Sequence, residues 1–153
     1  MIILGIDPGS RRIGYGLIEL NSGGVRLVRA GILSLLQKER GATLREIHKK
    51  LTHLIRAYSP RAVAIEKLFF AKNQKTAMQV AETRGVILLA VAQENIPLKE
   101  YGPKEVKLKI TGYGAADKKA VAKMVKHFLR APFLALPDDA MDALALALCA
   151  REH

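Results

Sequence analysis

Cysteine is nearly absent from this sequence, as are other features of extracellular and membrane proteins. The one cysteine among 153 residues, Cys149, cannot form an internal disulfide, which excludes a disulfide-stapled secreted fold and suits a reducing compartment. Because Cys149 lies in a stretch rich in Ala and Leu, we expect it to be a buried structural thiol. No apolar run approaches the roughly 20 residues that a membrane-spanning helix needs, and residues 1–6 lack the features of a secretory signal. We therefore expect a soluble, cytoplasmic protein.

Acidic residues are scarce relative to basic ones. The 14 Asp and Glu face 25 Lys and Arg, which gives a formal net charge of +11. A field of this sign attracts polyanions, of which nucleic acid is the commonest. The alternative is a basic surface that is merely solvated. Membrane-surface binding is not indicated, because no segment pairs a basic helical face with an exposed apolar one.

Half of the residues are apolar, which is enough for one ordinary domain spanning residues 1–153. Apolar runs bounded by turn residues predict strands, and 3.6-residue periodicity predicts helices. Residues 143–148 alternate Ala and Leu as a strand would, but both are strong helix formers and Pro137-Asp138 is typical of a helix start, so we expect a helix. The order predicts an α/β protein with a five-stranded mixed sheet and helices on both faces. The strands are expected at residues 2–6, 13–20, 25–35, 62–65 and 96–101, and the helices at residues 43–58 (with Thr43 as cap), 74–95, 103–110, 117–130 and from about 138 to 148.

Two acidic residues end buried apolar runs. Asp7 follows residues 2–6 and Glu66 follows residues 62–65, so each is expected at the carboxyl end of a central strand. In open α/β sheets that edge is where ligand sites form. Taken singly, Asp7 before Pro8-Gly9 is more commonly a turn residue, and Glu66 could mark a solvated strand end.

Asp139 and Asp142 stand three residues apart, which places both on one face of the last expected helix. Four carboxylates close together would repel one another, and Mg²⁺ or Mn²⁺, hard ions that prefer oxygen ligands, would reverse that repulsion. Two such ions could activate a water and stabilise the leaving oxygen in phosphodiester hydrolysis. The alternatives are that Asp138 and Asp139 are helix caps and that Asp142 is a surface charge. Because Asp138 is the better cap, we expect Asp139 rather than Asp138 in the site.

Several short blocks occur in a fixed order: Gly5-Ile6-Asp7-Pro8-Gly9-Ser10, Gly14-Tyr15-Gly16, Ala64-Ile65-Glu66 followed by Phe69 and Ala71-Lys72-Asn73, Arg84-Gly85-Val86, Val106-Lys107, and Asp139-Ala140-Met141-Asp142-Ala143-Leu144-Ala145. In these blocks the sequence resembles the RuvC family of Holliday junction resolvases over nearly its whole length. The first block alone is weak, because other ribonuclease H-like proteins and sugar-kinase or actin-like ATPases begin similarly. All the blocks in this order and spacing are highly specific.

The resemblance implies a ribonuclease H-like fold and a homodimeric endonuclease of DNA recombination and repair. It implies Mg²⁺-dependent nicking, with Mn²⁺ as a substitute, of two strands of like polarity placed symmetrically across a four-way junction. A branch-migration motor is the implied partner. Some relatives have His in place of Asp139. The family's metal-binding acids fall on Asp7, Glu66, Asp139 and Asp142.

The resemblance also assigns a role to one aromatic residue. Phe69 matches a ring that stacks on bases near the junction, and such stacking is worth about 1–3 kcal/mol per base. Ordinary core packing is the alternative for this residue and for Phe70.

Two groups of basic residues are expected to touch the DNA. The first matches family residues near the scissile phosphate, where a lysine could stabilise transition-state charge: Lys107 and Lys118. Neighbouring lysines compete for that role: Lys104, Lys109 and Lys119. The second group would contact phosphates without reading sequence: Arg11, Arg12, Lys72 and Lys75.

The helix expected at residues 74–95 is apolar around much of its circumference, so it needs cover on more than one side. Gly85 in its interior costs about 1 kcal/mol relative to Ala, which makes close packing there plausible. This helix is the candidate dimer contact, because a two-fold junction asks for a two-fold enzyme. Burial within one subunit is the alternative.

Two other functions remain open. A nucleotide-binding piece of an actin-like ATPase would use Asp7, Gly9 and Gly14 on a phosphate, but those proteins need two such domains around the nucleotide. A junction-binding protein without catalysis is the other, although all four acidic positions are filled.

Overall fold

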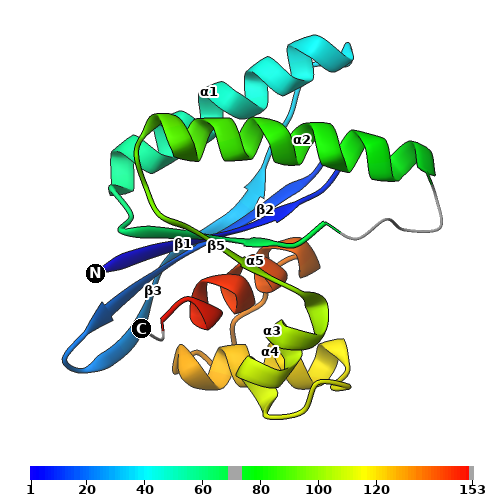
Figure 1. The fold of residues 1–153 in the computed structure, drawn as a ribbon. Helices are drawn as coiled ribbons and strands as arrows, with labels where there is room; N and C mark the ends of the chain where they lie inside the picture. Colours follow the sequence, from blue (N-terminus) through cyan, green and yellow to red (C-terminus); the bar gives the residue numbers. More distant parts are fainter. Residues whose placement is uncertain (69–73, 152–153) are drawn as a thin grey trace.

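A computed structural model describes residues 1–68 and 74–151 of the chain, and it contains a five-stranded mixed sheet in the order β3-β2-β1-β4-β5 (Figure 1). The central strand β1 pairs antiparallel with β2 and parallel with β4, and β4 pairs parallel with β5. Within the described ranges, no helix combines the length and apolarity needed to cross a membrane. The elements are β1 (Ile2–Pro8), β2 (Ile13–Asn21), β3 (Gly24–Leu33), α1 (Arg40–Tyr58), β4 (Ala62–Glu66), α2 (Gln74–Gln93), β5 (Leu98–Tyr101), α3 (Pro103–Thr111), α4 (Lys118–Phe128) and α5 (Asp138–Cys149).

Helices cover both faces of the sheet, as the sequence predicts (Figure 1). Because side chains alternate along a strand, Leu4 and Ile6 of β1 join the core beneath α1 and α2. Ile3 and its neighbour Ile18 on β2 join the other core, which α3, α4 and α5 complete. These large side chains are fully buried, and each contributes roughly 1.5–3 kcal/mol to folding.

Glycines let α5 lie directly on β1 and β2. Gly5 and Gly16 are cross-strand partners, and a Cβ on Gly5 would overlap the backbone of Ala143. A Cβ on Gly16 would stand 2.7 Å from the Leu144 side chain. Gly14 is the third such position, because its Cβ would overlap the backbone of Asp139. The sheet and the helix therefore approach more closely than any larger residue would allow.

The start of α1 differs from the prediction. Thr43 was the expected cap, but the helix begins at Arg40 and the cap is Glu39, whose carboxylate accepts hydrogen bonds from the amides of Gly41 (2.8 Å) and Ala42 (2.6 Å). Thr43 lies inside the first turns and its hydroxyl donates to the carbonyl oxygen of Glu39 at 2.9 Å. Ser, Thr, Asp and Asn are the usual cap residues, so the sequence pointed to the threonine instead of the glutamate.

The Ala/Leu segment near the end of the chain is helical, and Cys149 within it is buried, both as predicted. Asp138, however, is not the cap of α5: it is the first helical residue, and Pro137 precedes it without a side-chain cap bond.

Gly85 does not pack closely against its own chain, because a Cβ built there meets nothing within 4 Å. The close packing expected at this glycine is therefore not found within the described part of the chain.

Candidate metal-binding site

Asp7 and Glu66 lie side by side at one edge of the sheet. The parallel register of β1 and β4 ends with Ile6 opposite Ile65, and the acidic residue follows directly in both strands. The sequence prediction that each acid ends a buried strand is thus correct. Apolar residues hold both strands in the core, so the two carboxylates are fixed on a rigid edge.

The packing of α5 brings the other two acids to the same edge. Gly14 is the cross-strand partner of Asp7, and the backbone of Asp139 lies against Gly14. Asp142 follows on the same side of α5 and lines a cavity of about 250 Å³ with Asp7 and Glu66. Both acids lie near the amino-terminal end of α5, where the positive pole of the helix dipole stabilises negative charge. The remaining lining is basic or apolar: Pro103, Val106, Lys107, Lys118, Val121, Ala145 and Leu146.

Burial and mutual repulsion disturb the ionisation of this cluster. Desolvation first, and then the charges of Asp142, Glu66 and Asp139, raise the pKa of Asp7 to about 7. Burial, followed by the charge of Asp142, raises the pKa of Glu66. Burial also raises the pKa of Asp142, although Lys118 opposes the shift. A cation that entered the cavity would relieve the desolvation and the repulsion at once.

Two basic side chains partly neutralise the helix acids. The Nζ of Lys118 lies 3.3 Å from Oδ2 of Asp142, and Nε of Arg12 lies 3.2 Å from Oδ2 of Asp139. Asp138 is exposed, and its charge acts on Lys118 and Asp142, whereas that of Asp139 acts on Asp142 and also on Asp7. This difference favours Asp139 over Asp138 as the acid that shares a site with Asp7.

Among residues 1–68 and 74–151, no group of three or more His, Cys, Asp or Glu side chains has the arrangement of a finished metal site. The fit to a metal rests instead on the donor set. Carboxylate oxygens are the ligands that Mg²⁺ and Mn²⁺ prefer, and the basic partners of Asp139 and Asp142 are exposed enough to turn aside. The acids therefore supply the oxygen donors that divalent cations prefer, although the described side chains are not arranged around one.

Some of the basic residues expected to touch DNA lie at this edge, and others are known only to be exposed. Lys107 lines the cavity, and Arg11 and Lys75 are exposed. Phe69 and Lys72 lie outside the described residues. Of the competing lysines, Lys109 stands over the ring of Tyr101, whereas Lys104 and Lys119 are exposed.

Two arginines to which the sequence assigned no role hold neighbouring elements together: Arg84 contacts Glu66 of the site, and Arg40 joins the loop after β1 to α2. Arg84 on α2, with 15% of its side chain exposed, forms an ion pair with Glu100 on β5, and its Nε donates to the carbonyl oxygen of Glu66 at 3.4 Å. Arg40 donates to the carbonyl oxygen of Ser10 (2.9 Å) and to the hydroxyl of Thr83 (3.0 Å). Arg84 belongs to the block Arg84-Gly85-Val86, which carries part of the family resemblance, so the sequence offered a reason to single it out. It offered no such reason for Arg40, because the partners of Arg40 lie 30 and 43 positions away in the chain.

The chain matches known proteins over nearly its whole length. The family model described as "Crossover junction endodeoxyribonuclease RuvC" matches residues 3–150. The protein of that description from Roseiflexus sp. (strain RS-1) is 48% identical over 150 residues, covering 95% of this chain and 88% of the relative. That from Thermosipho melanesiensis is 48% identical over 151 residues, covering 97% of this chain and 96% of the relative.

Solved structures agree with these sequence matches. The Thermus thermophilus RuvC structure superposes with a TM-score of 0.89 at 31% identity, covering 97% of this chain and 92% of the other. The structure of T. thermophilus RuvC in complex with Holliday junction substrate gives a TM-score of 0.87 at 29% identity, with coverage of 97% and 91%.

Proposed function

Because the chain belongs to the RuvC family of crossover junction endodeoxyribonucleases, we propose that its four clustered acids hold the metal ions with which it cuts DNA. The protein is a Holliday junction resolvase with the family's α/β fold. One observation carries the proposal for the site: acids from the beginning, middle and end of the chain converge on one cavity beside Lys118.

The proposed ligands are Asp7, Glu66, Asp139 and Asp142, with two Mg²⁺ ions per site and Mn²⁺ as a substitute. When bound, such ions supply an activated water and stabilise the leaving oxygen. The residues' own contribution is to fix the ligand oxygens on two rigid strands and one helix. The apolar lining, which includes Val121 and Leu146, lowers the water content around them and strengthens each charge interaction.

Basic side chains complete the proposed site. Lys118, beside Asp142, and Lys107, on the wall of the cavity, are proposed to stabilise negative charge on the scissile phosphate. Arg12 is proposed to exchange its contact with Asp139 for a DNA phosphate. Arg11, Lys72 and Lys75 are proposed as further phosphate contacts, and Phe69 as the ring that stacks on a base beside the cut.

A homodimer would place two such sites on one junction, and we propose that α2 forms the contact. Met78 and Leu89 on this helix are 67% and 52% exposed, and Gly85 between them leaves open space for another backbone. Exposed apolar side chains around a glycine are typical of a close helix pair. Two-fold symmetry would then direct paired nicks into strands of like polarity.

The setting follows from the substrate. The curated relatives with which the chain shares 43–48% identity are bacterial proteins, so we propose that the enzyme works in the cytoplasm, on chromosomal DNA, together with a branch-migration motor.

A labelled four-way junction tests the activity and the site together. With Mg²⁺ we expect paired nicks, and with a chelator none. Asp7→Asn should abolish nicking but keep or improve junction binding, because it removes a negative charge that repels the DNA. Loss of binding in this variant would count against a metal role for Asp7, and an intact junction with the wild-type protein in Mg²⁺ would refute the activity.

A further inference from the structure

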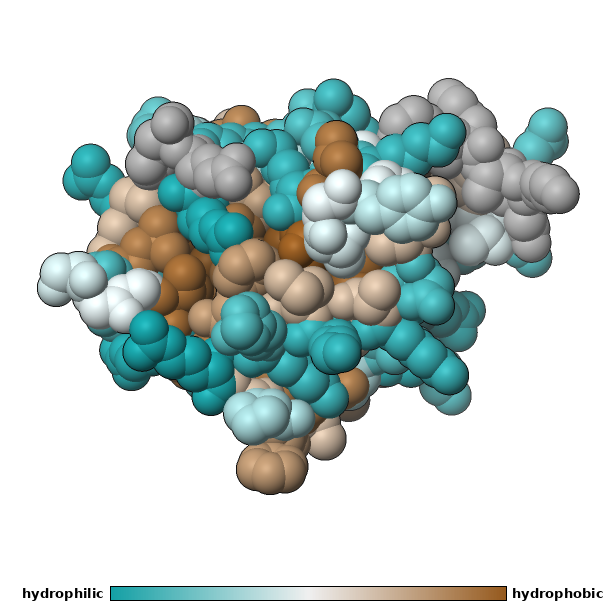
Figure 2. Space-filling model, turned by 90° about the horizontal axis from the view of Figure 1, so that it is seen from below, coloured by the Kyte–Doolittle hydropathy of each residue, from teal (hydrophilic) through white to brown (hydrophobic). Residues whose placement is uncertain are grey.

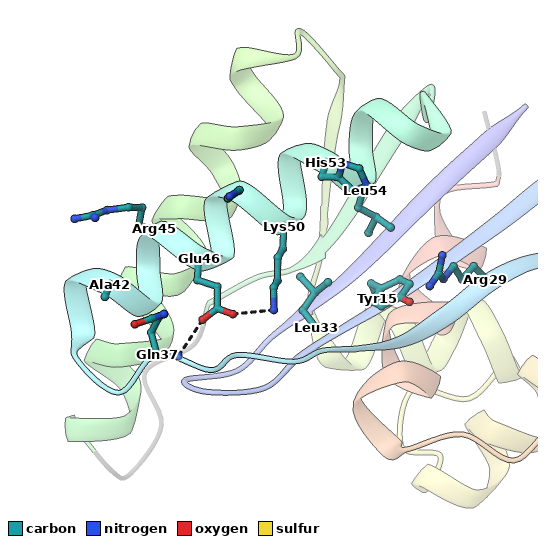
Figure 3. Close-up of a pocket in the computed structure, with 11 residues that line it drawn as sticks. Tyr15, Arg29, Leu33, Gln37, Ala42, Arg45, Glu46, Lys50, His53 and Leu54 are labelled. Atoms are coloured by element: carbon teal, nitrogen blue, oxygen red, sulfur yellow. Dashed lines mark hydrogen bonds and ion pairs between the residues drawn. The ribbon is translucent and has the colours of Figure 1, made fainter.

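A groove of about 740 Å³ separates α1 from the edge strand β3, away from the acidic cavity (Figure 3). Its floor is apolar and includes Leu33 from β3 and Leu54 from α1, which Figure 3 shows facing the space between the two elements. Most of its other side chains are basic: Arg29, Arg45, Lys49, Lys50 and His53.

The one acid that lines this groove is already neutralised. The carboxylate of Glu46 accepts hydrogen bonds from the amides of Leu36 (2.9 Å) and Gln37 (3.0 Å). It also forms an ion pair with Lys50 at 2.7 Å (Figure 3). Lys50 in turn donates to the carbonyl oxygen of Ser34. Glu46 and Lys50 therefore hold the loop before α1 against the helix, and Glu46 is engaged with groups other than Arg29, Arg45 and Lys49.

Arg29 is held by neutral groups. Its guanidinium donates to the hydroxyl of Tyr58 at 3.3 Å, and the ring of Tyr15, which also lines the groove, lies over Gly31. Arg29 thus keeps its full charge.

Within the described ranges, Arg29, Arg45 and Lys49 form no ion pair with a carboxylate. Elsewhere on the molecule, by contrast, Arg26 is paired with Glu19 and Arg56 with Glu94. Three unpaired cations around one groove favour an anionic ligand.

The groove shares a lining residue with a second depression. Gln37 lines both this groove and a second depression, of about 260 Å³, which is also lined by Arg11 and Lys38. Arg11 is adjacent in the chain to Arg12, which contacts Asp139. The basic side chains of the groove and those of the second depression therefore line two hollows that meet at Gln37, in the loop before α1.

We propose that this groove binds the phosphodiester backbone of one arm of the junction, at a distance from the bond that is cut. The inference rests on the proposed function. From residue 42 to residue 53 α1 rises by roughly 16 Å, which runs alongside about ten phosphate charges of duplex DNA. A polyanion of fixed charge spacing fits a line of cations on a helix and a strand. An acidic peptide from a partner protein is the competing occupant.

A double variant, Arg45→Ala with Lys49→Ala, tests the groove. Alanine suits these helical positions, and neither cation forms an ion pair within the described ranges, although the charge of Arg45 acts on the cap residue Glu39. A matching unfolding midpoint for the variant and the wild type verifies that the fold is kept. Affinity for a long-armed junction should fall on the order of tenfold, and the slope of log affinity against log salt should flatten by about 0.9 for each lost contact. Nicking at saturating protein concentration should be unchanged, since the acids are untouched.

The matched control removes the same charge from another face: Lys123→Ala with Lys126→Ala on α4, beside a separate depression. An equal loss of affinity in both double variants would reveal a general field effect and overturn the proposal. So would unchanged junction affinity in the groove variant, the result expected if the groove serves an acidic peptide.

Arm length supplies a second readout. When the arms are shortened stepwise, the deficit of the groove variant should vanish at the length where wild-type affinity itself drops; a deficit that persists on the shortest arms would refute the arm contact. A photo-cross-linker on Lys49→Cys should label the arm, since the other cysteine, Cys149, is buried. Failure of the groove proposal can be told apart from failure of the proposed function. If the proposed function is wrong, the wild-type protein will not nick even short-armed junctions with Mg²⁺.

Discussion

Ionising Asp7 destabilises the folded chain in the absence of metal. Its carboxylate is partly buried and faces three other acids, so its pKa stands at about 7 instead of the ordinary 3.8. The pKa values of Glu66 and Asp142 are raised for the same reasons, which makes the cluster a store of unfavourable electrostatic energy. Such stored repulsion is the physical basis of affinity for a cation.

The raised pKa predicts how stability changes with pH. Folded protein keeps a proton on Asp7 that the unfolded chain releases near pH 4, so the free energy of unfolding should fall as pH rises from about 4 to 7. Asp7→Asn removes this loss. With a chelator present, the variant should exceed wild type in stability by up to a few kcal/mol at pH 8 and by much less at pH 5.

Urea unfolding at the two pH values measures this difference, with Asp138→Asn at an exposed neighbouring position as the control. A stability gain that is equal at pH 5 and pH 8 would mean that the pKa of Asp7 is not raised in the folded protein.

At the scale of elements, the close packing of α5 on β1 and β2 determines where Asp139 and Asp142 lie. The helix can approach only because Gly5, Gly14 and Gly16 present bare backbone to it. The site thus depends on residues that carry no chemistry of their own. The glycines hold the distance between the acid-bearing helix and the acid-bearing strand.

Gly14→Ala should therefore impair the enzyme without removing an acid. The added methyl group overlaps the backbone of Asp139 and must push the start of α5 outward. Overpacking of this kind lowers the free energy of unfolding by about 1–3 kcal/mol, which leaves the protein folded. The nicking rate of the folded variant should nevertheless fall, because Asp139 has moved away from Asp7. Denaturant titration and a single-turnover nicking assay measure the two effects. Gly114→Ala is the control, because the nearest atom is 3.6 Å from the new Cβ, and it should leave stability and nicking unchanged. If the two variants behaved alike, the contact of α5 with Gly14 would not be what positions Asp139.

The exposed apolar face of α2 gives a prediction at the same scale. Leu89→Glu should convert a dimer to a monomer, because it buries a charge in the proposed contact. Sedimentation velocity measures the change. Leu108→Glu on α3, an exposed leucine of similar accessibility, is the matched control and should stay dimeric. A monomeric wild-type protein, or a dimer in both variants, would exclude α2 as the contact.

At the scale of the whole molecule, 25 Lys and Arg outnumber 14 Asp and Glu, so the net charge of the protein attracts DNA. Seen from the side of α3 and α4, hydrophilic side chains surround smaller hydrophobic areas (Figure 2). Junction binding should weaken with salt, with a log–log slope of about 0.9 per phosphate contacted, as fluorescence titration at several salt concentrations can measure. A response that is flat with salt would contradict an electrostatic mode of binding.

The sequence predicted the parts of the fold that depend on local periodicity. Runs such as residues 2–6 and 62–65 identified central strands, and the acids that end them followed from topology. The start of α1 was wrong, because a cap by Glu39 depends on how one flexible side chain folds back.

Long-range contacts lay beyond local patterns. The bracing by Arg40 and the pairing of Arg12 with Asp139 join residues far apart in the chain, and no spacing in the sequence encodes them. The groove beside β3 could likewise not be predicted from the sequence, because its cations come from β3 and α1, which meet only in the folded protein.

The position of α5 late in the chain has a consequence for synthesis. Asp139 and Asp142 emerge from the ribosome long after Asp7 and Glu66, and the glycine seat on β1 and β2 stays empty until then. A nascent polypeptide that stops before residue 138 has two of the four carboxylates of the proposed site and lacks the helix that carries the other two. Interrupted translation should therefore release fragments that are harmless to the chromosome, because the ability to cut arises only when the last helix docks.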